Sequence, residues 1–492
     1  MGNDVIVAIE LGSSKISGIA GTKNSDGSIE ILAYCKEDSS TLMKKGMVYN
    51  IDKTAECLSK IMNTLQMQLH CTISKAYVGI GGNALRTIKN RVPYKLNGET
   101  KVTQEIIDNI NDEDISLQIP NMEILDVIPQ EYKVGRDHET DPVGIVTDSI
   151  EGDFLNVICK TTIKKNLEMC LMKAHIEVPE YYISPKATAV AVLSESERKS
   201  CCALIDFGAE TTTISVYNNN ILKFLSTIPL GGNNITKDIM SEKIEKEDAE
   251  RLKIKYGYAK SKVTEDDEDE SYSFGEPKRT ISAKLLADII EARQQEIIAN
   301  AWHQIELSGQ KKDIIEIVLT GGASNMRELV EAIKSATNFA GEIKIMKAPC
   351  ASFKIKWDEM PINGTINTVV GLLSFSKESC GDMNNDEPAK GPIFHEDDIN
   401  KDVEIDKTGD DDEYDYDKEE KEEKRRKEEQ ERIDQEHDRA IKEAQKRDNK
   451  LLKQKRRDER AIEKEGKNKK SFGNILSNWK EKLFSDPGEE NE

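Results

Sequence analysis

The feature that most constrains the fold is a short pattern that occurs twice: an apolar strand carrying an acidic residue near its end and running into a glycine turn. The first copy follows the apolar run 5–9 and places Glu10 before Gly12. The second copy, at 204–216, places Asp206 before Gly208. A strand, a tight glycine turn and a returning strand leave backbone N–H groups directed at one spot, where small residues let a phosphate approach. The duplication therefore predicts two related lobes that face each other and grip a phosphate tail from both sides.

A third glycine turn completes the set. A buried strand at 314–319 runs into Gly321 and Gly322, and a helix is expected at 327–336. Glycines at this place let the backbone approach a flat ligand such as adenosine. Asp206, at its strand end, is placed to hold Mg²⁺ through water. Asp206 and Glu10 are also the candidates for positioning Mg²⁺ and water if hydrolysis occurs.

Charge and cysteine content argue against several classes of function. The formal net charge of −21 repels phosphate backbones, so we expect no general nucleic-acid binding. The nine cysteines include no Cys-x-x-Cys pair, which argues against a zinc site and fits a reducing cytosol. No signal peptide is recognised before the first strand, and no apolar run reaches the roughly 20 residues that span a bilayer. The pattern predicts a protein that does not cross a membrane but can touch one.

The composition changes sharply after residue 380. Up to that point, apolar strand-like runs alternate with helical patterns, which is typical of an α/β fold. The helical pattern at 53–69, for example, places Leu58, Ile61, Met62 and Leu65 on one face. Residues 381–417 are acidic and poor in core-forming residues, which predicts a disordered linker, and 418–468 predict a charged helical or disordered spacer.

The segment 469–485 predicts an amphipathic helix that binds a membrane surface. Its large apolar residues fall within an arc of about 100° at 3.6 residues per turn, with lysines at the edges where their stems can snorkel. The apolar arc and its flanking lysines are Phe472, Ile475, Leu476, Trp479, Lys480, Lys482 and Leu483. A helix that packs on the protein's own core, or on a partner protein, is the alternative for this segment.

The three turns, in this order, resemble the phosphate-1, phosphate-2 and adenosine motifs of the actin/Hsp70/sugar-kinase superfamily. Within that superfamily the chain resembles the bacterial cell-division FtsA family over about residues 4–378 and at the C-terminal tip. The segments that carry this resemblance are 76–82, 102–105, 127–132, 228–236, 250–253 and 368–373. The most family-specific of them contains Pro129-Gln130-Glu131-Tyr132.

The resemblance implies an α/β, actin-like, two-lobed ATPase fold with an inserted subdomain and a charged tail that ends in the amphipathic helix. The implied subdomains are 1A (1–81, 163–203 and 371–380), 1C (82–162), 2A (204–238 and 310–370) and 2B (239–309). The implied cofactors are ATP and Mg²⁺. The nucleotide-binding residues expected from the motifs and the resemblance are Gly12, Ser13, Ser14, Lys15, Gly208, Thr211, Thr212, Gly231, Gly232, Glu250, Lys253, Gly321, Gly322, Ala323 and Met326.

The resemblance also implies a set of partners and a location. These are the C-terminal tail of FtsZ, bound through 2B; further copies of the chain in a filament; later division proteins, bound through 1C; and an anionic membrane surface at the cytoplasmic face of the division site. The tip helix would be the membrane-targeting sequence of the family. The implied role is a scaffold that anchors the FtsZ ring to the inner face of the cytoplasmic membrane.

Two departures from the superfamily pattern bear on catalysis. The first acid is Glu10 where aspartate is usual, and the second turn has Ala209-Glu210-Thr211 where Gly-Gly-Thr is usual. A carboxylate at Glu210 would repel phosphates unless a cation or a rotamer that turns it away intervenes. We therefore expect ATP binding with weak or no ATPase activity.

Other functions on the same fold remain open at this point. A small-molecule kinase would need an acceptor-side acid and substrate groups in the cleft, and the sequence identifies neither. An Hsp70-like chaperone would need a β-rich domain after residue 380, where the charged spacer begins instead. An actin-like adaptor of another membrane assembly, such as a pilus, is the remaining alternative; the Pro129–Tyr132 segment argues against it.

Overall fold

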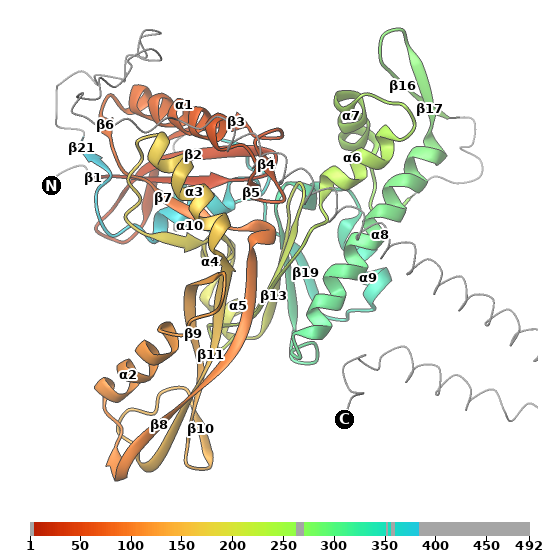
Figure 1. The fold of residues 1–492 in the computed structure, drawn as a ribbon. Coiled ribbons are helices and arrows are strands. Elements are labelled where there is room, and N and C mark those ends of the chain that lie inside the picture. The colour runs from red at the N-terminus through yellow and green to blue at the C-terminus, as the bar shows by residue number, and fades with distance from the viewer. Residues whose placement is uncertain (1–3, 262–269, 351–352, 356–359, 383–492) are drawn as a thin grey trace, which may run out of the picture. The chain divides into compact units, whose positions relative to one another are not determined.

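The structure is a computed structural model that describes residues 4–261, 270–350, 353–355 and 360–382 (Figure 1). Its first sheet has the strand order β12-β7-β1-β2-β3-β20, with β21 and β6 attached beside β1. The elements up to the inserted subdomain are β1 (Asp4–Leu11), β2 (Lys15–Lys23), β3 (Ile29–Asp38), β4 (Met43–Lys44), β5 (Met47–Val48), α1 (Ile51–Leu69), β6 (Thr72–Ile73), β7 (Tyr77–Ile80) and the 3₁₀ turn η1 (Gly82–Ala84).

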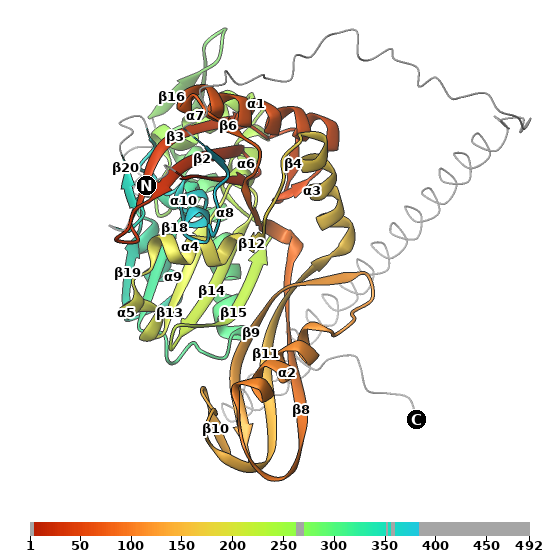
Figure 2. The same ribbon diagram turned by 90° about the vertical axis from the view of Figure 1, so that its left-hand side faces the viewer.

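A four-stranded sheet with one helix follows as an insertion, and the chain then returns to the first sheet. The insertion contains β8 (Leu85–Lys101), α2 (Gln104–Ile115), β9 (Met122–Val134), β10 (Asp137–Glu139) and β11 (Val146–Lys160). The returning elements are α3 (Thr161–Lys173), β12 (Tyr181–Ile183), α4 (Ser184–Val192) and α5 (Glu195–Lys199). Figure 2 shows α2 alongside the lower half of the long inserted strands and β10 near their far end.

The second lobe is built on the sheet β15-β14-β13-β18-β19. Its elements are β13 (Cys202–Phe207), β14 (Thr212–Asn218), β15 (Ile221–Ile228), α6 (Gly232–Met240), α7 (Lys246–Tyr256), β16 (Ser271–Phe274), β17 (Arg279–Ser282), α8 (Ala283–Leu307), β18 (Glu316–Thr320), η3 (Gly322–Asn325), α9 (Leu329–Thr337) and β19 (Glu342–Ile345). The chain ends its described course in β20 (Phe353–Ile355), α10 (Asn367–Ser374) and β21 (Gly381–Asp382), which belong to the first lobe.

The two lobes repeat one topology, as the duplicated turns predict. In the first, β1 pairs antiparallel with β2 and parallel with β7, and β2 pairs antiparallel with β3. In the second, β13 pairs antiparallel with β14 and parallel with β18, and β14 pairs antiparallel with β15. Even the hairpin registers agree, because Leu11 faces Ile16 and Phe207 faces Thr212 across loops of equal length.

Helices cover both faces of the first sheet, which explains its continuous apolar strands. Residues 5–9 of β1 are all buried, as expected for a strand covered on both sides. Helix α1 packs on β2 and β3, whereas α10 packs on β1, β2 and β7 (Figure 1). The predicted stripe of α1 is confirmed, since Leu58, Ile61, Met62 and Leu65 are all buried. Asn50 caps this helix by accepting a hydrogen bond from the Lys53 N–H at 3.0 Å.

The inserted subdomain has a small core of its own. Helix α2 packs on β8, β9 and β11, and its N-terminus is capped by Thr103. The buried cluster consists of Val92, Val102, Ile107, Ile110, Tyr132, Val134, Ile150 and Phe154. Tyr132 and Phe154 meet edge to face with ring centroids 6.3 Å apart. This core is separate from the two larger cores of the lobes.

The predicted C-terminal segments lie almost entirely outside the described residues, and one boundary needs correction. Gly381 and Asp382 were predicted to open a disordered linker. They form β21 instead, which pairs with β1 and β6. The edge of β1 beside Val5 offers backbone groups that this short strand can bond, so the ordered chain extends past residue 380. The spacer 418–468 and the helix 469–485 lie wholly beyond the described residues.

One contact in the first lobe leaves no room for a side chain. Gly371 of α10 lies against α4 so closely that an added Cβ would stand 1.9 Å from the Ala187 carbonyl oxygen. We expect Gly371→Ala to lower the free energy of unfolding by about 1–3 kcal/mol, or to prevent folding, because α10 and α4 must separate. The control, Lys60→Ala on the exposed face of α1, should change the free energy of unfolding by less than about 0.5 kcal/mol. Denaturant unfolding measures both, and an unchanged midpoint for Gly371→Ala would contradict this packing.

Candidate functional site

The two duplicated hairpins meet at one cleft of about 370 Å³ that is lined by both lobes. The first lobe contributes residues 10–15, and the second contributes Asp206, Gly208, Ala209, Thr211 and Thr213. The two turns have the same internal hydrogen bond: the Gly12 N–H donates to the Lys15 carbonyl at 3.0 Å, and the Gly208 N–H donates to the Thr211 carbonyl at 2.9 Å. The predicted convergence of the turns on one space is therefore what the fold produces.

Glycine is required at these turns for a steric reason. A Cβ on Gly12 would lie 2.8 Å from the Lys15 carbonyl oxygen, and a Cβ on Gly208 would lie 2.7 Å from that of Thr211. The most crowded position is Gly321, where a Cβ would lie 2.2 Å from Asp206 Oδ1. Gly321 also has a φ of 88°, which L-residues rarely adopt. The floor of the cleft is thus made of backbone that a ligand can approach closely.

Three ionisable groups at the floor of the cleft have shifted pKa values. Burial raises the pKa of Glu10 to about 7, while the nearby Lys15 ammonium opposes this rise and Asp206 adds to it. Burial likewise raises the pKa of Asp206 to about 6. Burial lowers the pKa of Lys15 to about 8 against the opposing effect of Glu10. A cation beside the two carboxyls and an anion beside Lys15 would favour the charged form of all three groups.

This donor set fits a magnesium ion that arrives with phosphates. Among the described residues no group of three or more His, Cys, Asp or Glu side chains could hold a metal ion. Mg²⁺ is commonly held by one or two carboxylates together with water and substrate phosphates, and Asp206 and Glu10 supply such a pair. The residues present therefore fit Mg²⁺ bound to a polyphosphate better than a metal held by protein alone.

A further group of cleft residues comes from the turn after β18 and from α7. Gly322, Ala323 and Met326 line the cleft from the second lobe, as do Glu250 and Ile254 of α7. Ile254 is 70% exposed, so it presents an apolar wall to whatever enters. The helix predicted at 327–336 begins only at Leu329, because Glu328 has a φ of 59° and interrupts it. Exposed apolar surface beside a carboxylate can receive a flat ring and a sugar hydroxyl.

Most of the predicted nucleotide residues line the cleft, and two do not. Thr212 and Gly231 lie outside the lining. The Thr212 hydroxyl donates to the Leu230 carbonyl at 2.9 Å, which holds the strand end next to the Gly231–Gly232 turn. The Gly231 N–H donates to Asn234 Oδ1 at 3.0 Å and so begins α6. Thr212 and Gly231 therefore hold in place the backbone next to the cleft and do not line it themselves.

Sequence reasoning missed several residues of the first lobe that line the cleft. They are Gly46, Gly81, Gly82, Ser184, Pro185, Thr188 and Thr368, with Gly364 and Thr365 completing the edge from the segment before α10. A signal for two of them was present. Gly81-Gly82 follows β7 just as Gly321-Gly322 follows β18, so the pair Gly81-Gly82 is also part of the pattern that the two lobes repeat. The others have no local pattern: Gly46 lies in the β4–β5 turn, and the rest are brought in by α4, by α10 and by the segment before α10.

Glu210 is turned away from the cleft. Its Oε2 accepts a hydrogen bond from the Lys45 N–H of the first lobe at 2.8 Å, and its Oε1 lies 3.6 Å from the Lys237 ammonium. The next amide, that of Gly46, donates to the Ser13 hydroxyl at 2.7 Å. The β4–β5 turn therefore joins the two glycine turns, and the repulsion expected between Glu210 and a phosphate is reduced because the carboxylate is already engaged.

None of the helices in the described part of the chain is long and apolar enough to cross a membrane. The predicted membrane-contact residues, from Phe472 to Leu483, lie outside the described residues.

Two family models match the chain. The one described as "Cell division protein FtsA" matches residues 203–362, and the one described as "SHS2 domain inserted in FTSA" matches residues 82–158. The second match covers the inserted sheet from η1 almost to the end of β11.

Relatives and a solved structure agree with these matches. The chain is 32% identical over 330 residues to the cell division protein FtsA of Bacillus subtilis, covering 66% of this chain and 74% of the relative. It is 31% identical over 341 residues to FtsA of Neisseria meningitidis serogroup B, covering 66% and 80%. The structure of a PilM-PilN type IV pilus biogenesis complex has a TM-score of 0.55 at 14% identity, covering 75% of this chain and 97% of that chain, which shows the fold alone.

The resemblance read from the three turns and the Pro129–Tyr132 segment is thereby confirmed, as is the actin-like fold of two lobes with an inserted subdomain. A role in cell division follows from these relatives. The chain belongs to the FtsA family of cell division proteins.

Proposed function

We propose that the chain is an ATP-binding, membrane-tethered scaffold that anchors the FtsZ ring to the inner face of the cytoplasmic membrane and recruits later division proteins. The observation that carries the nucleotide part is the pair of matching acid–glycine hairpins, one from each lobe, that line a single cleft. Gly12 and Gly208 would leave room for the phosphates, and Asp206 and Glu10 would hold Mg²⁺. The bound metal would supply charge neutralisation between the phosphates and the two carboxyls.

Binding without rapid turnover fits the charges around the cleft. Glu210 joins the second turn to the Lys45 amide of the first lobe, so its carboxylate holds the lobes together and is not free to orient water. In a scaffold, the nucleotide would then serve to fix the relative position of the lobes. A small-molecule kinase on this fold remains the alternative, and ATP consumption that depends on an added small acceptor would favour it.

Removing the Asp206 carboxylate tests the assigned cleft. We expect Asp206→Ala to weaken binding of Mg-ATP by about tenfold or more, because one of the two carboxyls that neutralise the metal is lost. Titration calorimetry on the full chain measures this. Asp108→Ala, on the exposed surface of α2, is the matched control and should bind as the unmodified chain does. Equal affinities for both variants would remove the cleft from the proposal.

Removing the Glu210 side chain tests the contact between the lobes. In Glu210→Ala the Lys45 N–H loses its acceptor, so we expect faster hydrogen exchange at that amide and at neighbouring residues of the β4–β5 turn. Glu242→Ala, an exposed glutamate just after α6, should leave the exchange of this turn unchanged. If Lys45 keeps its protection in Glu210→Ala, the Glu210 contact does not hold the lobes together.

The scaffold role also needs partners and a membrane. The family supports a division-site protein, and we place the FtsZ tail on subdomain 2B, later division proteins on subdomain 1C, and further copies of the chain in a filament. The membrane contact is assigned to the helix 469–485, because its apolar arc and lysine edges suit an anionic surface. A single short helix binds reversibly, and several helices in one filament would hold far more tightly through avidity.

A charge placed on the apolar arc of the tip helix tests the anchor. We expect Trp479→Glu to abolish sedimentation of the full chain with vesicles that contain phosphatidylglycerol, because a carboxylate would replace the largest apolar side chain of the arc. Asn478→Glu introduces the same charge on the polar face and should largely retain binding. Equal sedimentation of Trp479→Glu and the unmodified chain would exclude this helix as the anchor.

A further inference from the structure

The β4–β5 turn is bonded to both glycine turns of the cleft. Its Gly46 N–H donates to the Ser13 hydroxyl of the first turn at 2.7 Å, and its Lys45 N–H donates to Glu210 Oε2 of the second turn at 2.8 Å. The Lys45 carbonyl accepts a third hydrogen bond, from the Asn83 N–H at 2.9 Å. Two of these bonds stay within the first lobe, and the bond to Glu210 is the one that crosses to the second.

A small second cavity, of about 20 Å³, adjoins the β4–β5 turn. Gly46 and Gly81 line both this cavity and the cleft, so the wall between the two spaces includes the backbone of the turn. Met43 and Met47 line the small cavity from β4 and β5. Methionine side chains are flexible and adapt their shape to a changed space. The turn therefore borders two spaces, and its apolar neighbours can adjust if it shifts.

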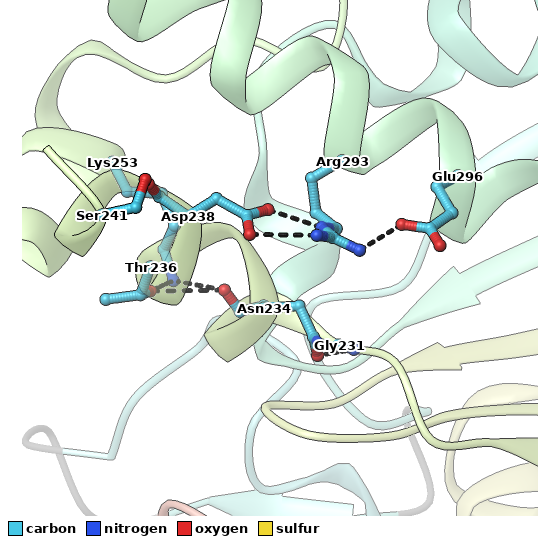
Figure 3. A network of polar contacts seen from close by, with 9 residues as sticks. Gly231, Asn234, Thr236, Asp238, Ser241, Lys253, Arg293 and Glu296 are labelled. Carbon is cyan, nitrogen blue, oxygen red and sulfur yellow. Dashed lines mark hydrogen bonds and ion pairs between the residues drawn. The ribbon is translucent and has the colours of Figure 1, made fainter. Parts of the chain in front are cut away.

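The second-lobe side of the crossing bond is held more firmly than the β4–β5 turn. Two amides at the start of α6 donate to the Gly208 and Ala209 carbonyls, at 3.0 and 2.6 Å. Farther along α6, Asp238 accepts two hydrogen bonds from the Arg293 guanidinium of α8, at 2.5 and 2.9 Å (Figure 3). By contrast, β4 and β5 pair at only two positions. A short ladder with few bonds opens more readily than a helix tied at both ends, so we expect the β4–β5 turn to be the part that moves.

We propose that Glu210 is a latch: its hydrogen bond to the Lys45 amide holds the β4–β5 turn against the second lobe, and a nucleotide enters and leaves the cleft when this bond opens. The inference rests on the proposed nucleotide site. A ligand gripped between two lobes exchanges with solvent only when the lobes part, and this bond joins them.

The latch controls the rate of exchange and not the affinity. Neither Glu210 nor Lys45 lines the cleft, so their bond makes no contact with the nucleotide. A bond that is equally strong in the empty and the occupied protein cannot shift the binding equilibrium. It slows entry and exit by the same factor, which a residue that merely supported the bound state would not do.

The test measures release of labelled Mg-ATP from the full chain, by filter binding after a chase with unlabelled Mg-ATP, and the Kd by titration calorimetry. Glu210→Ala should release Mg-ATP about tenfold faster with a Kd within about twofold, so that association is faster by the same factor. Glu210→Gln keeps an oxygen that can accept from the Lys45 N–H and should release within about threefold of the unmodified rate. Lys237→Ala removes only the ion pair of 3.6 Å at an exposed side chain and should release within about twofold.

Four results would overturn the latch. They are an unchanged release rate in Glu210→Ala; a Kd of Glu210→Ala that rises by the same factor as its release rate; a Glu210→Gln that releases as fast as Glu210→Ala; and a Lys237→Ala that does so. If the unmodified chain binds Mg-ATP and one of these results is found, this inference alone fails. If the unmodified chain does not bind Mg-ATP, the proposed function fails with it.

Discussion

The close approach of Gly321 to Asp206 is the constraint on which the rest of the site depends. Strands β13 and β18 run parallel and end side by side, so the acid at the end of one meets the glycine that follows the other. Any side chain at Gly321 would collide with the carboxylate, and the backbone there is already in a conformation that suits glycine. Because the two residues share this space, the aspartate is held at the floor of the cleft that both lobes line.

The inserted subdomain is joined to the second lobe as well as to the first. The register of β9 against β11 shifts at Gln130, so that this residue has no partner in the ladder. Its side chain reaches across to donate to the Leu222 carbonyl of β15 at 3.0 Å. Nearby, the Thr87 hydroxyl donates to the Leu225 carbonyl of the same edge strand at 3.2 Å. Tyr132, two residues on, turns to the inserted core and donates to Asn111 of α2. The family-specific segment therefore contacts both the edge of the second lobe and the core of the insertion.

The direction in which each acidic side chain points matters more for the charge in the cleft than the number of acidic residues around it. Glu210 stands in the second turn where a small residue is usual, yet its carboxylate is engaged by the Lys45 amide and lies near Lys237. Glu10 and Asp206, by contrast, are half-buried, have raised pKa values and line the cleft between the lobes. The acid that would oppose a phosphate is turned aside, and the acids that could share a metal with it remain in the cleft.

The sequence alone determined the duplicated strand-and-turn plan, the third glycine turn, the family and the apolar face of α1, because each of these is a local pattern of residue types at fixed spacing. It also pointed to most of the cleft residues, since those lie within the turns themselves. It did not reveal the role of Gly81 and Gly82, the strand at Gly381–Asp382 or the hairpin β16–β17, and it gave no reason to connect Gly46 with Ser13. Those features depend on which strand edge, helix or polar group comes to lie opposite, and that is decided only when residues far apart in the chain pack together. Rotamers are set in the same way: the sequence places a carboxylate at position 210, and the first lobe determines where it points.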